Sequence, residues 1–253
     1  MSHRQHLSTI LGRGLVPAVL GMIVIIISAV IATAASLGEA SSTDLFAADF
    51  TGTPTTPLLP TSTTTTSASG SDVYDGFDGS GPLHVRVADS GQAWTVHAGA
   101  FLIDGSAATG AAVGVSRATI SSGFANAEVA APATAATNRN FGLIINAAPD
   151  GSSYFHSRQT RQGNGRSELV RVSGGVSTVV ATANGTGDTT GLVRLTHFNG
   201  VYRLFRGTTQ LVTYTATAAE ITQFGSNTRH GIYTNADATT LFESFSVVGY
   251  AGP

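Results

Sequence analysis

Short alternations of apolar and polar residues, separated by turn-forming residues, fill the chain from Asp72 onward. An alternation with period two predicts strands that bury one face. The predicted strands cover residues 83–88, 93–97, 101–103, 115–120, 125–130, 140–146, 154–158, 167–172, 177–183, 191–198, 201–206, 210–214, 231–234 and 242–248. The one helical candidate in this region is the short segment 216–224. So many short strands predict an all-β domain, a two-sheet antiparallel sandwich of jelly-roll type spanning residues 72–253.

Four dipeptides between predicted strands support antiparallel pairing. Gly and Asn tolerate the positive φ angle that tight hairpin turns require. The clearest hairpin joins 191–198 to 201–206 through Asn199-Gly200. The other three turns are predicted at Asp104-Gly105, Asp150-Gly151 and Gly174-Gly175.

A different pattern, an uncharged apolar run, occupies residues 15–37. As a helix, its roughly 23 residues would measure about 35 Å, enough to cross the apolar part of a bilayer. Arg4 and Arg13 precede the run, and the charges that follow it are acidic. The positive-inside rule therefore predicts a cytoplasmic N-terminus and an extracytoplasmic remainder.

Residues 1–37 have two interpretations. Ala32-Thr33-Ala34 is a small-x-small sequence after which signal peptidase can cut, and cleavage there would secrete a protein that starts at Ala35. The apolar run is longer than a typical signal-peptide core, which favours a signal-anchor, a transmembrane helix that stays in the membrane. Both interpretations place the β domain outside the cytoplasm.

A segment poor in core-forming residues links this run to the β domain. Residues 38–71 form a juxtamembrane segment and a stalk, and residues 51–71 are almost entirely Thr, Ser, Pro and Gly. Such a composition cannot bury a core and predicts an extended or disordered linker.

Composition excludes several kinds of chemistry. Among the 253 residues there is no Cys, and all 13 basic residues are Arg. Disulfides, thiolate metal sites, a thiol nucleophile and a Schiff-base lysine are therefore excluded. A net charge of -2 leaves no basic footprint for nucleic acid. The absence of Cys in an exported protein is more typical of bacteria than of animals.

The order of motifs in the domain resembles that of the concanavalin A-like lectin/glucanase superfamily, and within it the laminin-G-like modules of bacterial exported proteins and phage tail proteins. The matching motifs are Asp72-Val-Tyr-Asp-Gly-Phe-Asp78, Gly81-Pro-Leu-His-Val-Arg86, Asp89, Gly91, Ala93-Trp-Thr-Val-His97, Phe101-Leu-Ile-Asp-Gly105 and the closing Phe242-Glu-Ser-Phe-Ser-Val247. The resemblance implies a jelly roll with paired first and last strands and a concave sheet that faces the ligand in many relatives. It indicates a fold more than an activity.

Catalytic motifs of that superfamily are missing. Its glucanases carry two glutamates on one strand, as the retaining hydrolysis of a glycosidic bond requires, and the glutamates here are isolated. A divergent hydrolase or lyase that uses carboxylates from different strands, such as Asp89 with Glu128 or Glu168, stays open. The domain histidines show no spacing typical of zinc ligands.

Two kinds of binding site remain. Relatives often bind calcium near the joined terminal strands, and the resemblance implies Asp75, Asp78 and Glu243 as its ligands; the alternative is that these acids cap turns or face solvent. The second candidate is a glycan-binding site, a polar platform of side chains that can hydrogen-bond to sugar hydroxyls or pair with uronic acids. The platform candidates are His156, Arg158, Arg171, Arg194 and Arg203; the alternative is that these arginines keep exposed faces and edge strands soluble.

The leading functional hypothesis is a non-catalytic recognition or adhesion module, displayed outside a bacterial cell and directed at a polysaccharide or cell-surface glycan. The alternatives are the divergent hydrolase or lyase and a structural component of an envelope or phage-like assembly. Within the motif-rich opening segment, Trp94 is expected to fill the space between the sheets. Arg86 and Asp89 are expected to tie this segment to its neighbour.

Overall fold

The computed structural model describes residues 73–135, 140–160, 165–186, 190–236 and 238–250. The signal or membrane segment 1–37 and the linker 38–71 lie outside these residues and stay predictions. No helix among the described residues is long and apolar enough to cross a membrane.

One sheet contains ten strands, among them the first and the last strand of the described chain. Its edge-to-edge order is β14 (Thr209–Thr215), β13 (Val201–Arg206), β12 (Thr190–Phe198), β7 (Ala127–Thr134), β16 (Leu241–Phe242), β5 (Ala108–Gly110), β4 (Phe101–Gly105) and β2 (Gly79–Pro82). The closing strand β17 (Phe245–Gly249) pairs with both β7 and β1 (Val73–Asp75). The pairing of the first and last strands that the resemblance implies is therefore confirmed.

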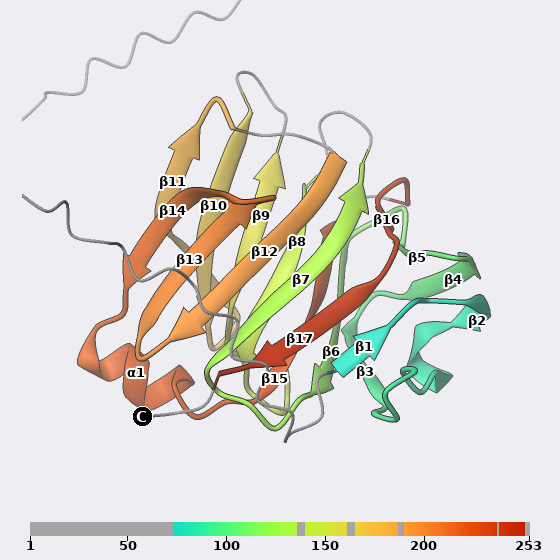
Figure 1. Cartoon of the computed structure of the whole chain (residues 1–253), viewed down its shortest axis with the longest axis horizontal. Helices are drawn as coiled ribbons and strands as arrows, with labels where there is room; N and C mark the ends of the chain where they lie inside the picture. The colour runs from blue at the N-terminus through green and yellow to red at the C-terminus, as the bar shows by residue number, and fades with distance from the viewer. Residues whose placement is uncertain (1–72, 136–139, 161–164, 187–189, 237, 251–253) are drawn as a thin grey trace, which may run out of the picture. The chain divides into compact units, whose positions relative to one another are not determined.

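The other sheet contains seven strands and is antiparallel throughout. Its order is β11 (Val176–Asn184), β10 (Arg166–Ser173), β9 (Tyr154–Thr160), β8 (Asn140–Ala147), β15 (Arg229–Asn235), β6 (Val115–Ser121) and β3 (Trp94–Ala98). The two sheets lie face to face, with β12, β7 and β17 in front of β9, β8 and β15 (Figure 1). The predicted all-β sandwich is confirmed for the described residues.

The predicted turns form as the sequence indicates. Asn199 and Gly200 adopt φ angles of 48° and 77° between β12 and β13. Gly105, Gly151 and the Gly174-Gly175 pair also have positive φ angles at the other predicted turns. Their lack of a Cβ atom makes this backbone conformation accessible.

Three details of the strand prediction were wrong. Residues 83–88 form no strand: a 3₁₀ helix, η1 (Leu83–Val85), closes with a hydrogen bond from Arg86 N to Leu83 O. The closing segment 242–248 divides into β16 and β17. The short strands β2 and β5 were missed, because a Gly-Ser-Gly-Pro strand and an Ala-Thr-Gly strand show no alternation.

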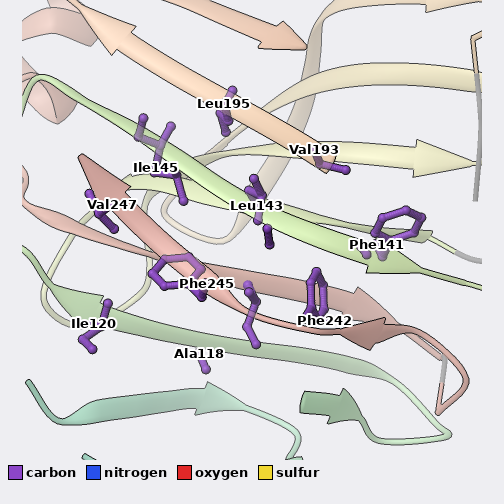
Figure 2. Packing of buried hydrophobic residues seen from close by; sticks show 14 of the residues in the cluster. Ala118, Ile120, Phe141, Leu143, Ile145, Val193, Leu195, Phe242, Phe245 and Val247 are labelled. Carbon is purple, nitrogen blue, oxygen red and sulfur yellow. The ribbon is translucent and has the colours of Figure 1, made fainter. Parts of the chain in front are cut away.

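The core lies between the two sheets. Phe141, Leu143 and Ile145 alternate along β8 and point toward Phe242 and Phe245 of the opposite sheet (Figure 2). The Phe141 and Phe242 rings meet edge to face with centroids 6.3 Å apart. These side chains are at most 1% exposed, so the alternation that predicts the strands also builds the core.

The one predicted helix also forms. Helix α1 (Ala218–Phe224) starts with a capping box, in which Thr217 and Glu220 each accept a hydrogen bond from the backbone N–H of the other. Phe224 is fully buried and contacts Phe155 of β9 edge to face, with ring centroids 4.8 Å apart. The helix is thus anchored to the core of the sandwich.

Candidate functional site

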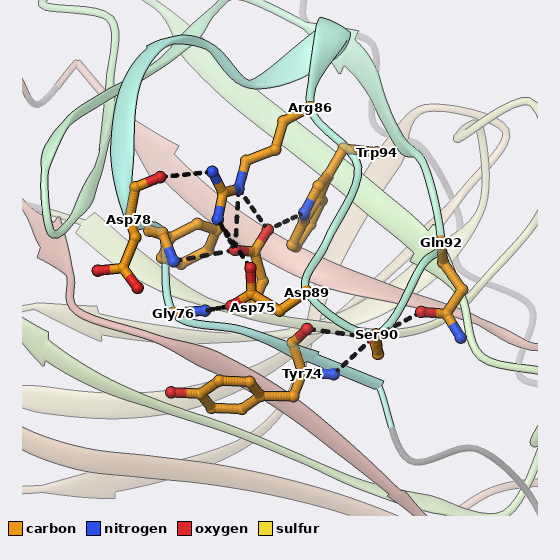
Figure 3. A network of polar contacts seen from close by, with 10 residues as sticks. Tyr74, Asp75, Gly76, Asp78, Arg86, Asp89, Ser90, Gln92 and Trp94 are labelled. Carbon is orange, nitrogen blue, oxygen red and sulfur yellow. Dashed lines mark hydrogen bonds and ion pairs between the residues drawn. The ribbon is translucent and has the colours of Figure 1, made fainter.

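The opening segment, rich in acids, forms a structural network around Asp75 (Figure 3). Asp75 is fully buried and accepts hydrogen bonds from the Phe77 N–H at 2.9 Å, from Arg86 Nη2 at 2.6 Å and from Trp94 Nε1 at 2.7 Å. Arg86 also donates to the carbonyl oxygen of Asp78 and pairs with Asp89. Arg86 therefore neutralises the buried carboxylate.

This arrangement does not assemble the three calcium candidates. Asp75 faces the Arg86 guanidinium, which occupies the place of a cation at this carboxylate. Asp78 and Glu243 are exposed. In the described part of the chain, no three acidic or histidine side chains converge as metal ligands.

The five glycan-platform candidates lie on several faces. His156 and Arg158, on β9, share the outer face of their sheet, because Phe155, which precedes His156, points into the core. Arg171 of β10 is on the core side and pairs with Glu220 of α1 at 2.5 Å. Arg194 and Arg203 share the outer face of the other sheet, because their neighbours Val193, Leu195, Tyr202 and Leu204 point into the core. There Arg194 pairs with Glu128 of β7.

Around His156 and Arg158, the strands β10, β9, β15 and β6 present a set of aromatic and charged side chains on the outer face of the seven-stranded sheet, with β8 between β9 and β15. Strand register joins the members: Arg117 of β6 pairs with Tyr233 of β15, and Arg158 of β9 pairs with Glu168 of β10. We call this set the outer-face cluster, and it comprises Arg117, Tyr154, His156, Arg158, Glu168 and Tyr233.

The centre of the outer-face cluster is His156. Its ring lies between two tyrosine rings, with centroids 5.6 Å from Tyr154 and 4.4 Å from Tyr233. Tyr154 and Tyr233 belong to a small second apolar cluster together with Ile144 and Val170. Because these neighbours are buried, the aromatic rings are held in fixed positions.

The arginines of the cluster are also held in place. The Arg117 guanidinium carbon lies 5.2 Å from the centre of the Tyr154 ring, and its Nη1 donates to the Tyr154 hydroxyl at 3.1 Å and to the Gly151 carbonyl at 3.0 Å. Arg158 Nε donates to Glu168 at 2.6 Å. Such contacts reduce the entropy that an arginine loses when it binds a ligand.

His156 is held in one neutral form. Its Nδ1 lies 2.9 Å from the Ser157 carbonyl, which can only accept, so Nδ1 carries the proton and Nε2 is an acceptor. Burial is the main cause that lowers the pKa of His156 to about 3; the Arg158 and Arg117 charges act in the same direction, and the Ser157 hydrogen bond opposes them. Nε2 makes no hydrogen bond to any residue that the structure describes.

Two other buried histidines have structural roles. His197 donates from Nδ1 to the Ala125 carbonyl and accepts at Nε2 from the Gly200 N–H. His230 donates to the Phe124 carbonyl at 2.8 Å. An open pocket of about 580 Å³ lies beside His197, next to Asn199 and Ile221. Both nitrogens of His197 are occupied, so it offers this pocket no acid or base.

Sequence reasoning missed Arg117, Tyr154 and Tyr233. Tyr154, His156 and Arg158 follow one another at the i, i+2, i+4 positions of a strand, and this spacing could have shown that they share a face. No sequence signal placed β6 and β15 near β9, since β15 follows β9 by almost seventy positions in the printed sequence.

Comparisons with known proteins bear on the fold. No protein-family model and no curated protein matches the chain. A carbohydrate-binding module, CBM66, from Bacillus subtilis is 10% identical, and the match covers 62% of this chain and 91% of that chain with a TM-score of 0.45. A Bacillus subtilis protein of unknown function with a galectin-like fold is 12% identical over 69% of this chain and 96% of that chain, also with a TM-score of 0.45.

A Bacillus licheniformis beta-glucanase has the same TM-score, 0.45, at 9% identity, and the match covers 72% of this chain and 99% of that chain. The described chain forms two facing antiparallel sheets with paired terminal strands. This architecture is a two-sheet antiparallel jelly-roll sandwich, and these likenesses extend to the fold alone. Which ligand such a jelly roll binds depends on its own side chains.

Proposed function

We propose that the domain is a non-catalytic recognition module that binds glycans through the outer-face cluster. The observation that carries the proposal is the neutral His156, whose acceptor Nε2 is unused by the described residues and which is flanked by the Tyr154 and Tyr233 rings. Arg117 and Arg158 add donors on either side of it.

This combination suits a sugar. A sugar ring has apolar C–H groups that pack on aromatic rings and hydroxyls that need both donors and acceptors. The cluster offers two guanidinium groups with fixed positions, and beside them the residues Tyr154, His156 and Tyr233 keep 5%, 3% and 7% of their surface exposed for the ligand. A pre-positioned set of this kind lowers the ordering cost of binding.

A binding role without catalysis is supported by the state of the carboxylates. Hydrolysis of a glycosidic bond needs a pair of carboxyl groups across the bond. Glu168 is the one carboxylate of the outer-face cluster, and Arg158 and Arg166 both pair with it. The carboxylates of the divergent hydrolase, Asp89 with Glu128 or Glu168, lie on different parts of the fold: Asp89 is beside Arg86, and Glu128 is on β7 of the sheet opposite Glu168.

Display outside the cytoplasm is part of the proposal and depends on residues 15–37. An uncharged run of this length after two arginines supports export, whether the segment is cleaved after Ala34 or retained as an anchor. Fractionation of expressing cells separates the two: a released product that starts near Ala35 contradicts the anchor, and a membrane-bound full chain contradicts cleavage.

A glycan array probed with the full chain tests the binding role. His156→Phe keeps a ring between the two tyrosines but removes the acceptor, so we expect binding to weaken roughly 3- to 10-fold, the usual effect of one lost hydrogen bond. His84→Phe, in the exposed η1 segment, is the matched control and leaves binding unchanged.

Two outcomes contradict the proposal. If the unsubstituted chain binds no glycan, the domain is not a glycan-recognition module. If His156→Phe binds as tightly as the unsubstituted chain, while melting curves show both folded, the glycan binds at a different place on the domain.

A further inference from the structure

We infer that the ligand of the outer-face cluster is an acidic glycan, a polysaccharide that carries carboxylate or sulfate groups. This inference rests on the proposed function and narrows its ligand class. It starts from the charges on the outer face of the seven-stranded sheet.

Four arginines project from this face. Arg117 and Arg158 belong to the cluster, and Arg166 lies two residues before Glu168 on the same side of β10. Arg229 of β15 lies two residues before Gly231 and four before Tyr233, and it donates to Thr95 of β3 at 3.2 Å. The four cations therefore come from four strands of one sheet.

The described carboxylates near these arginines are fewer. Glu168 pairs with Arg158 and Arg166. Asp150, in the turn between β8 and β9, lies beside His97 and precedes Gly151, whose carbonyl accepts a hydrogen bond from Arg117. The summed charge of these arginines and carboxylates is positive, although the whole chain has a net charge of -2. A concentration of positive charge on one face attracts an anionic ligand.

Arg117 is the arginine best placed to bind an acidic group directly. No described carboxylate pairs with it, and its two hydrogen bonds to described residues both come from Nη1. Its Nε is buried and has no hydrogen-bond partner in the described part of the chain. Because Nε is buried and Nη1 is used, Nη2 is the donor group that the guanidinium keeps for an oxygen of a carboxylate or sulfate.

The spacing of the arginines indicates a chain rather than a small anion. Arg117 on β6 and Arg158 on β9 are separated by β15 and β8. Three strand spacings correspond to about 14 Å between their backbones. The Tyr233 and His156 rings lie between them, so a ligand that reaches both arginines also covers the aromatic centre of the cluster. An oligosaccharide with more than one acidic group fits this arrangement.

Matched pairs of polymers test the inference with the full chain. Polygalacturonate is compared with its fully methyl-esterified form, and dextran sulfate with dextran, because each pair differs mainly in charge. We expect at least one acidic polymer to bind at least about tenfold more tightly than its neutral counterpart, as charge-assisted hydrogen bonds do. Raising NaCl from about 50 mM to about 300 mM should weaken that binding several-fold.

Substitutions of single arginines show which of them causes the preference for the acidic polymer. Arg117→Gln should remove most of the preference for the acidic polymer, and Arg117→Lys should retain part of it, because lysine keeps the charge but not the planar fork. Arg203→Gln removes an arginine from the outer face of the other sheet and should leave the preference unchanged. Melting curves show which variants are folded.

The outcomes separate the two proposals. Equal binding of the neutral and acidic polymers, with loss in His156→Phe, overturns the acidic ligand class and leaves glycan recognition standing. An acidic preference that Arg117→Gln and Arg203→Gln reduce equally also overturns the inference. If neither the polymers nor the glycan array show binding, the proposed function itself fails.

Discussion

The indole Nε1–H of Trp94, on β3 of the seven-stranded sheet, donates to Oδ2 of Asp75, on β1 of the other sheet, at 2.7 Å. The same indole contacts Phe245 of the last strand edge to face, with ring centroids 5.0 Å apart. One side chain thus links the first strand, the last strand and the seven-stranded sheet. The opening segment that contains the single tryptophan is therefore structural.

Trp94→Phe tests the hydrogen bond from Trp94 to Asp75. Phenylalanine keeps much of the aromatic packing but leaves Oδ2 of Asp75 with one donor fewer. We expect the free energy of unfolding to fall by about 1.5–3 kcal/mol, the usual range for a hydrogen bond to a charged group. Trp94→Ala, which also opens a cavity, should lower it by about 3–5 kcal/mol. Urea denaturation measures both, and unchanged midpoints would contradict the assignment.

Asp75→Asn tests the buried ion pair. Arg86, whose side chain is 18% exposed, would lose the negative charge of the fully buried Asp75 that it pairs with. Breaking a buried pair by removing one partner costs about 3–5 kcal/mol of unfolding free energy. Asp78→Asn keeps the backbone carbonyl that Arg86 uses and should change stability by less than about 0.5 kcal/mol. Equal effects of the two substitutions would argue against a special role for Asp75.

Calcium removal has a separate expected outcome. Because the described acids do not converge, EGTA should leave the melting temperature of the full chain unchanged. A clear fall in melting temperature with EGTA, reversed by added calcium, would show a structural ion that this account omits.

Acidification should destabilise the domain through its buried histidines. Burial lowers the pKa of His230 to about 4 and that of His156 to about 3, against an ordinary value of 6.5. Below about pH 6.5 the unfolded chain therefore binds more protons than the folded one, and stability is lost as pH falls. Each of these histidines contributes up to about 1.4 kcal/mol of loss per pH unit.

Between about pH 6.5 and pH 5, the loss of stability caused by the histidines can be measured apart from the loss caused by protonation of carboxylates. The pKa of Glu220 is lowered to about 2, because hydrogen bonds from Thr217, Tyr214 and Arg171 outweigh the opposing effect of burial. Its stabilisation is lost only below its ordinary pKa of 4.5. Urea denaturation across the window measures the histidine effect, and a constant free energy of unfolding would contradict it.

Local patterns predicted most of the fold. The Asn199-Gly200 hairpin and the buried Trp94 follow from turn chemistry and alternation, which act over a few residues. The η1 segment was misread as a strand because Leu83, Val85 and Val87 alternate with polar residues, although both valines are exposed. An alternation of apolar and polar residues can thus also occur in a segment, such as η1, that forms no strand.

The candidate site was less predictable, because it depends on which strands are neighbours. Period two shows that His156 and Arg158 share a face, but it cannot show that Arg194 belongs to the other sheet. Along β9 the outward residues Tyr154 and His156 are as buried as the inward Phe155, so the strand shows no polar face. Only the assembled sheet brings Arg117 and Tyr233 beside them.

Hydrogen–deuterium exchange of the full chain, with and without a bound polysaccharide, tests most directly whether the outer face of the seven-stranded sheet is the binding surface. We predict that binding slows exchange in peptides covering β6, β9 and β15, and leaves β12, β13 and β14 unchanged. Protection confined to β12–β14, or to the pocket beside His197, would contradict the account.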